Sequence, residues 1–200
     1  MFDTSEKPLD VKSVLRSHYR EESDTWKILL RHGELVAAKA LAVADRIAHL
    51  KPDRAFLVEC AYLHDIGIGK THTPTLGCHG TAPYIQHGLI GRELLDAVGL
   101  HRHGLVCERH VGAGITAADI REKGLPLPER DLVPLTLEEE IICYADQFFS
   151  KDGDRIAVAR SVDRIRSQLA RYGDRQRAAF DEWVERFESS SRGLSADALP

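Results

Sequence analysis

Apolar side chains recur every three or four residues along most of the chain, which is the spacing of a helix that buries one face. One clear stripe runs through Val36, Ala40, Val43, Ile47 and Leu50. No segment shows a convincing alternation of apolar and polar residues, as a half-buried strand would. The pattern therefore predicts an all-α fold.

Breaks between the stripes divide the chain into several helices. Lys51-Pro52 ends the first one, Asp53 is placed to cap the next, and Gly173 interrupts a later stripe. Two segments hold Pro and Gly without a clear period, and we expect a long loop at 71–86 and an irregular connection at 119–135. Further helices are expected over about 87–98, 101–110 and 138–150, along the stripe Val158–Tyr172, and from about Phe180 onward.

Length and composition fit one domain with a real core, because 43% of the 200 residues are apolar and 29% are charged. We expect a helical core over about 24–150, a C-terminal helical extension over 153–188 and a disordered tail over 189–200, with disorder also in the first seven or so residues. There is no signal-peptide pattern and no stretch of the ~18–20 apolar residues that a spanning helix needs. A cytoplasmic protein without membrane contact is therefore expected.

Charge and cysteine content narrow the function classes. The formal net charge of −4 gives no pull of the whole chain toward nucleic acid. Residues 151–177 carry eight basic and four acidic side chains, but only one aromatic residue, Tyr172, stands among the arginines, so a solvated helix face is favoured over a nucleic-acid surface. The four cysteines form no C-x-x-C pair, which argues against a thiolate zinc site. The sequence leaves open whether the chain forms a homo-oligomer.

Several histidines and a carboxylate occupy positions that should face the core. His64, His87 and Asp146 each lie on the inward stripe of a different predicted helix, while His32 and His110 lie at helix ends. For any one of these histidines a hydrogen-bonded core residue is the commoner case, and Asp146 alone fits a buried salt bridge equally well. Together, however, nitrogen and anionic oxygen donors converging from several helices suit a divalent metal ion.

The order of these residues resembles the HD-domain metal-dependent phosphohydrolase superfamily, in its HDIG-containing branch. The resemblance covers roughly residues 26–150. It is carried by five stretches in sequence: LLRHGELVAAKAL, AYLHDIGIGKTH, IQHGLIGRELL, ERHVGAGIT and EEEIICYADQFF. The family likeness implies an HD-domain-like helical bundle around a metal site.

The resemblance also implies a role for each matching residue. The primary metal ligands would be His32, His64, Asp65 and Asp146. His87 and His110 match the added ligands of members with two ions, in which Asp65 would bridge the two. One or two ions of Mn, Fe, Co, Ni or Mg would then activate a water molecule that attacks phosphorus. The expected substrate is a small phosphorylated molecule, preferably a nucleotide or cyclic phosphodiester.

Three flanking residues are candidates for handling this substrate. Lys70 could contact a phosphate or the charge that develops during catalysis, although it stands two positions later than the lysine that directly follows HDIG in cyclic-dinucleotide phosphodiesterases. Arg109 could bind a phosphate with two hydrogen bonds or simply form an ion pair. His72 could be a further ligand or a proton donor. We predict catalytic roles for Asp65 and Lys70, and substrate binding by Lys70, Arg109 and His72.

Two other function classes fit the same ligands. Some HD-domain proteins, myo-inositol oxygenase among them, hold two irons in this six-ligand set and activate dioxygen. A non-catalytic chain could instead use a structural metal and bind a nucleotide or a partner. The sequence chooses neither the substrate, nor a monoester over a diester, nor one ion over two.

Overall fold

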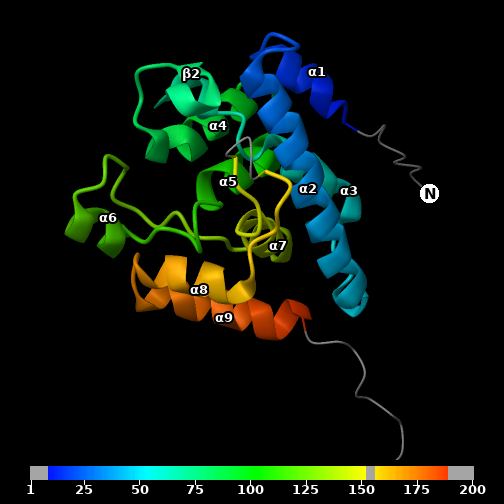
Figure 1. Cartoon of the computed structure of the whole chain (residues 1–200), viewed down its shortest axis with the longest axis vertical. Helices are drawn as coiled ribbons and strands as arrows, with labels where there is room; N and C mark the ends of the chain where they lie inside the picture. The colour runs from blue at the N-terminus through cyan, green and yellow to red at the C-terminus, as the bar shows by residue number, and fades with distance from the viewer. Residues whose placement is uncertain (1–8, 152–155, 189–200) are drawn as a thin grey trace, which may run out of the picture.

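The computed structural model describes residues 9–151 and 156–188, which form a bundle of α-helices (Figure 1). The predicted disorder of the first residues and of 189–200 lies outside this described part. The α-helices are α1 (Val11–Arg16), α2 (Asp24–Arg46), α3 (Arg54–Leu63), α4 (His87–Asp96), α5 (His101–Arg109), α6 (Ala117–Lys123), α7 (Leu137–Asp146), α8 (Val162–Ala170) and α9 (Asp174–Glu188). Short 3-10 turns are η1 (Ala48–Leu50), η2 (Ile68–Lys70), η3 (Pro74–Leu76) and η4 (Tyr84–Gln86).

Side chains that accept hydrogen bonds from the first turn fix where the helices begin. The side chain of Ser23 accepts from the backbone N–H of Trp26 at the start of α2, and Asp53 accepts from that of Phe56 at the start of α3. Such caps satisfy backbone donors that have no partner within the helix. The predicted cap at Asp53 is therefore confirmed.

The bundle is centred on α2, which packs against α3 and α7, while α4 packs against α5. Apolar side chains on the facing sides of α2, α3 and α7 form the main core. The all-α prediction is confirmed, with one small addition inside the expected loop 71–86: β1 (His72–Thr73) and β2 (Cys78–His79) pair as an antiparallel ribbon. Two residues a strand are too few to leave an alternating pattern in the sequence.

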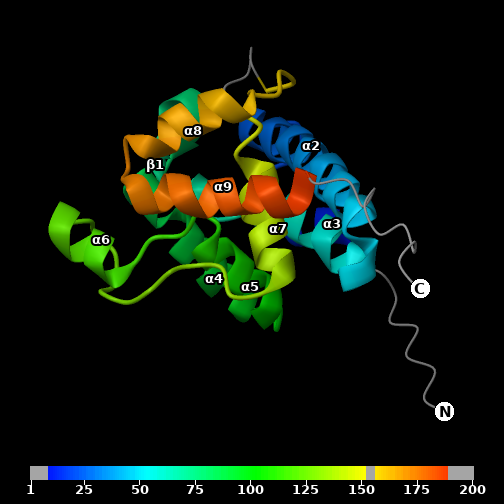
Figure 2. The same ribbon diagram turned by 90° about the horizontal axis from the view of Figure 1, so that it is seen from below.

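The C-terminal helices belong to the same core. Tyr144 of α7 stacks on Phe180 of α9 with ring centroids 5.5 Å apart and contacts Phe187 at 5.3 Å. Its hydroxyl also donates to a carboxylate oxygen of Glu188 at 2.6 Å. Figure 2 shows α9 lying across α7, with α8 beside it. The extension is thus held by buried aromatic contacts, which are large contributors to core energetics.

The predicted stripes were wrong where they ran past a helix end. Val158 precedes the cap at Ser161 and is 67% exposed, while Tyr172 follows the last residue of α8 and is 57% exposed. Leu50 and Val98 are likewise exposed, because α2 ends at Arg46 and α4 at Asp96. The last helix begins six residues before Phe180.

Two helices were missed: α1, and α6, which overlaps the start of the connection predicted at 119–135. For α6 a sequence signal was available. Its signal is local: Thr116 and Asp119 form a capping box, in which each side chain accepts from the other residue's backbone N–H. In the described part of the chain, every helix is too short or too polar to cross a bilayer.

Candidate metal centre

Six of the predicted site residues meet inside the bundle, each brought there by the end or the inner face of a helix. They are His32 in α2, His64 and Asp65 just after α3, His87 at the start of α4, His110 just after α5 and Asp146 at the end of α7. The first five are at most 2% exposed, and the side chain of Asp146 is 13% exposed. Their roles as ligands stay a prediction, but the convergence that those roles require is present.

A backbone hydrogen bond orients three of the imidazoles. In His64, His87 and His110, Nδ1 lies 2.7–2.9 Å from the carbonyl oxygen three residues earlier in the chain. An Nδ1–H that donates to a carbonyl leaves Nε2 free to bind a metal, and this second contact also fixes the ring orientation. The three Nε2 atoms all lie near the Asp65 carboxylate.

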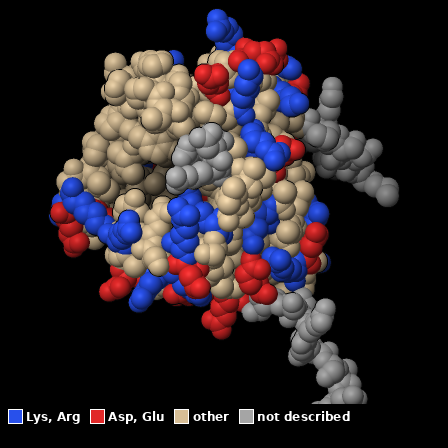
Figure 3. All heavy atoms as spheres, viewed as in Figure 1, with Lys and Arg blue, Asp and Glu red and all other residues tan. Residues whose placement is uncertain are grey.

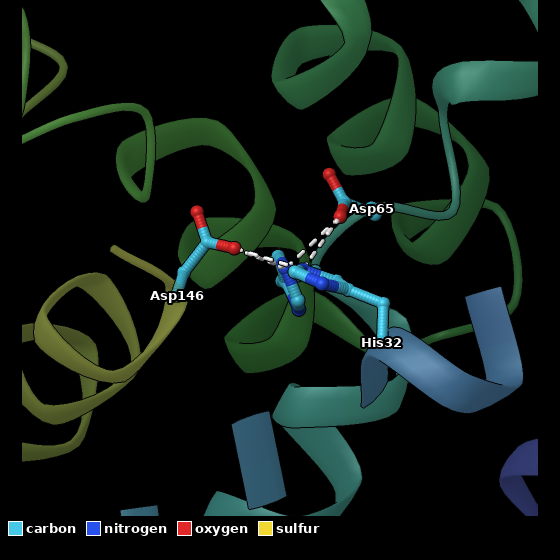
Figure 4. Close-up of side chains that lie close together, drawn as sticks. His32, Asp65 and Asp146 are labelled. Atoms are coloured by element: carbon cyan, nitrogen blue, oxygen red, sulfur yellow. Dashed lines mark hydrogen bonds and ion pairs between the residues drawn. The ribbon is translucent and has the colours of Figure 1, made fainter. Parts of the chain in front are cut away.

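The first group of possible ligands is His32, His64, Asp65 and Asp146. Nε2 of His32 lies 2.8 Å from Oδ1 of Asp146 and 3.5 Å from Oδ2 of Asp65. Nε2 of His64 lies 3.0 Å from that same Asp65 oxygen. Figure 4 shows the two carboxylates reaching toward the His32 imidazole from different elements.

The second group uses the other oxygen of Asp65. Oδ1 of Asp65 lies 3.3 Å from Nε2 of His87 and 3.5 Å from Nε2 of His110, whose Nε2 atoms are 3.1 Å apart. In each group the ligand atoms lie within 4.8 Å of one another. Asp65 therefore offers one oxygen to each group, which is the arrangement of a carboxylate that bridges two ions.

A cation fits this donor set. Both carboxylate oxygens of Asp65 and Nε2 of His64 are buried and have only short contacts that lack the direction of a hydrogen bond. Buried polar atoms are costly without a partner, and a buried carboxylate is more so. Nitrogen and carboxylate donors without thiolates suit Mn, Fe, Co or Ni, with Mg at an oxygen-rich site. The described residues thus include a His and Asp cluster that could hold divalent metal.

Glycine makes room for this assembly at the HDIG turn. A Cβ atom on Gly67 would overlap the carbonyl oxygen of His87 and the backbone nitrogen of Gly91. The absence of a side chain at Gly67 therefore lets α4 approach the turn closely enough for His87 to reach Asp65.

The carboxylates and the imidazoles shift one another's pKa. Burial opposes the charge of Asp65, but His64 and Lys151 outweigh it and hold the pKa of Asp65 well below its usual range. Burial also opposes a charged His64, yet Asp65 and Asp146 together raise its pKa to about 10. Burial lowers the pKa of His32 to about 4, with Lys151 adding to the shift. The same cause, with His110 nearby, lowers the pKa of His87 to about 3.

Lys151 is a site residue that the sequence did not reveal. Its Nζ lies 2.8 Å from Oδ2 of Asp65 and 3.7 Å from Oδ1 of Asp146, with 14% of the side chain exposed. It also lies close to Tyr84: burial raises the pKa of the Tyr84 hydroxyl to about 12, and the positive charge of Lys151 opposes that rise. The only sequence signal was its position, five residues after Asp146. A lone lysine beyond a helix end normally indicates a solvated loop.

The three residues predicted to handle substrate do not join the cluster. Lys70 is exposed and lines a separate hollow of about 220 Å³ together with His18. One nitrogen of Arg109 donates to both carboxylate oxygens of Glu139, at 3.0 and 3.1 Å. Arg109 thus forms an ion pair, which was the alternative to phosphate binding. His72 lies on β1 with its side chain exposed. Substrate binding by these three residues stays a prediction.

A cavity of about 480 Å³ lies beside the centre. His87, His110, Asp146 and Lys151 line it on one side. Residues of α6 and of the C-terminal extension, including Leu169 and Tyr172, also line it. Figure 3 shows lysine and arginine side chains gathered over α6 and α8, beside a hollow in this face. The volume is within the ~300–1,000 Å³ typical of small-molecule sites.

Comparison with known proteins decides the family. A family model described as HD domain matches residues 29–150. The chain belongs to the HD-domain family. HD domains are helical and bind divalent metal, in agreement with the bundle and the cluster described above. α8 and α9, which complete the cavity, lie beyond the matched segment.

Three individual relatives match between 42% and 70% of the HD-domain chain. One from Picrophilus torridus, named tRNA (cytidine(56)-2'-O)-methyltransferase, is 36% identical over 62% of this chain and 32% of its own length. A protein of the same name from Thermoplasma volcanium is 32% identical over 70% of this chain and 37% of its own. An uncharacterized protein of Methanocaldococcus jannaschii is 42% identical over 42% of this chain and 43% of its own. The chain thus spans about a third of the two methyltransferases, and no solved structure matches it.

Asp65→Ala is expected to lose bound metal, because it removes the one side chain shared by both groups. Elemental analysis after dialysis should find at least about tenfold less metal than in the parent chain, the loss typical of removing a site's supporting groups. Far-ultraviolet circular dichroism should remain that of a helical protein. Full metal occupancy in folded Asp65→Ala would contradict the assignment.

Metal binding is expected to release a proton near pH 7. With its pKa raised to about 10, His64 is protonated in the metal-free chain, yet a metal ligand must be neutral. Affinity for Mn²⁺ should therefore rise between pH 6 and pH 8, by up to about tenfold per pH unit. Calorimetric titrations in buffers of different ionisation enthalpy count the released protons, and a count of zero would refute the prediction.

Proposed function

We propose that the chain hydrolyses a small phosphate ester, with a nucleotide as the preferred class of substrate, by means of divalent metal held at the six-residue centre. One observation carries this proposal. The two oxygens of Asp65 face two separate groups of ligands, and both groups border the same cavity. A bridging carboxylate next to an open cavity is the architecture of a two-metal hydrolytic site.

Different residues of the chain would hold the metal and bind the phosphate. His32, His64, Asp65, Asp146, His87 and His110 would hold the ions. Bound divalent ions would lower the pKa of a coordinated water and neutralise phosphoryl oxygens. Lys151 and Arg160 add positive charge to the cavity wall, where a phosphate would lie. The cavity also leaves room for substrate, which argues for catalysis over a closed structural site.

The cavity also presents apolar surface that suits an organic group with a flat face. Phe149, Leu169 and Tyr172 supply apolar surface there. Tyr84 and Tyr172, at 37% and 57%, are the most exposed of the Phe, Trp and Tyr residues within the described ranges, and both line this cavity. The Gln168 amide also lines it and forms no hydrogen bond with any described residue. Exposed aromatic rings and a spare amide are what a nucleobase requires for stacking and hydrogen bonding.

The relatives agree with a nucleotide-derived substrate, since two of them are named for a modification of a tRNA cytidine. Methyl transfer is not proposed, because the chain spans only about a third of those proteins. The two-iron oxygenases of the family use the same six ligand types, so oxygen dependence is the property that separates the two chemistries.

Hydrolysis is expected to continue without oxygen. Metal-loaded protein, purified and assayed anaerobically on a panel of nucleotides and phosphodiesters, should release phosphate or nucleotide at the same rate as in air. Asp65→Ala is the control and should be inactive under both conditions. Turnover that stops without oxygen would identify an oxygenase instead. The absence of turnover on every ester, with metal bound, would favour a non-catalytic role.

Tyr172→Ala is expected to weaken nucleotide binding. Stacking of a base on an aromatic ring contributes about 1–3 kcal/mol, so KM for the best nucleotide should rise about fivefold or more. KM for glycerol phosphate, which has no aromatic group, should not change. Val158→Ala is the matched control, since Val158 is 67% exposed and does not line the cavity. Equal effects of Tyr172→Ala on both substrates would contradict this placement.

A further inference from the structure

Lys151 belongs to neither ligand group but contacts the first one directly. Its Nζ approaches Oδ2 of Asp65 and Oδ1 of Asp146. These are the same oxygens that lie 3.5 and 2.8 Å from Nε2 of His32, and 3.0 and 3.5 Å from Nε2 of His64. The ammonium group therefore lies against the oxygen atoms that a first metal ion would need.

An ammonium and a metal ion cannot both use these lone pairs fully. Nζ lies 2.8 Å from Asp65, at hydrogen-bond distance, whereas a divalent transition metal binds carboxylate oxygen at about 2.0–2.2 Å. Two carboxylates buried together need positive charge nearby, because isolated charges are costly in the interior. In the chain without metal, Lys151 supplies part of that charge. When a bound metal ion supplies the positive charge, the carboxylates no longer need the ammonium group beside them.

The cavity beside the centre has room for the Lys151 ammonium group once it leaves the carboxylates. Lys151 lines the 480 Å³ cavity, and its side chain is a flexible four-carbon stem that carries a compact point charge. Its neighbour Tyr84 lines the same cavity and is 37% exposed. A short swing of Nζ away from Asp65 therefore brings it toward the space where a phosphate would lie.

We propose that Lys151 is an exchangeable cation of the centre: it neutralises Asp65 and Asp146 in the metal-free chain, and on metal binding it turns to the phosphoryl oxygens of the substrate. The second half of this proposal rests on the proposed hydrolysis of phosphate esters. A permanent structural ion pair would behave differently. It would stabilise the fold but would neither oppose metal binding nor contribute to phosphate binding.

The test compares Lys151→Met with Lys27→Met, a control on the exposed surface whose Nζ pairs with Glu22. Calorimetry at fixed pH gives the affinity for Mn²⁺, and titration of the Mn²⁺-loaded protein with inorganic phosphate gives the affinity for phosphate. Lys151→Met should bind Mn²⁺ about tenfold more tightly than the parent chain, because the competing buried cation is gone. It should bind phosphate about tenfold more weakly, because one charge-assisted contact is lost. Lys27→Met should match the parent chain in both.

Unchanged or weaker Mn²⁺ binding by Lys151→Met would overturn the proposal, and so would unchanged phosphate binding. If Lys151→Met does not fold, Lys151→Gln gives the same comparison, because it keeps a donor near Asp65 but removes the charge. The proposed function fails separately, if the Mn²⁺-loaded parent chain hydrolyses no phosphate ester. In that case the difference in Mn²⁺ affinity still tests the exchange of cations.

Discussion

The buried carboxylate of Asp65 is the constraint around which the structure is arranged. A carboxylate with both oxygens inside a helical bundle is among the costliest groups to leave uncompensated. Here the Nε2 atoms of two imidazoles and one ammonium lie within 3.3 Å of its oxygens, and the Nε2 atoms of two more imidazoles lie 3.5 Å away. All of these groups therefore have the Asp65 carboxylate as a common neighbour.

The fold meets this constraint with helix ends. Four of the five elements that contribute to the centre do so at or just beyond a terminus, and only His32 projects from within a long helix. Near a terminus the backbone can turn, so neighbours such as His64 and Asp65 can both face one point. The carbonyl contacts of Nδ1 in three of the histidines then hold their rings in a single orientation. A preorganised site of this kind requires little rearrangement when it binds a cation.

The six candidate ligands could be predicted from the sequence to lie together, because they are residue types that are costly inside a core and because their order along the chain resembles a known family. His64, His87 and Asp146 stood on apolar stripes, where a polar residue calls for an explanation. The surroundings of the centre were less accessible. Lys151 lies beyond the end of α7, where periodicity carries no information, and its contact with Asp65 spans 86 positions of the chain. Lys70 and Arg109 stand near candidate ligands in the sequence but do not line the cavity beside the centre, so nearness in sequence does not decide which side chains share a cavity. Helix ends were mispredicted at Val158 and Tyr172 because a stripe records spacing and not the cap that stops a helix.

Leu169 joins two properties that are usually separate. It is 2% exposed within the main core, and it also lines the cavity beside the metal centre. Any change in its size alters both the packing density of the fold and the shape offered to a ligand. Tyr172, three residues later and 57% exposed, lines the cavity without being part of the core. Substitutions at residue 172 can therefore change ligand preference with little effect on core packing, whereas substitutions at residue 169 change both.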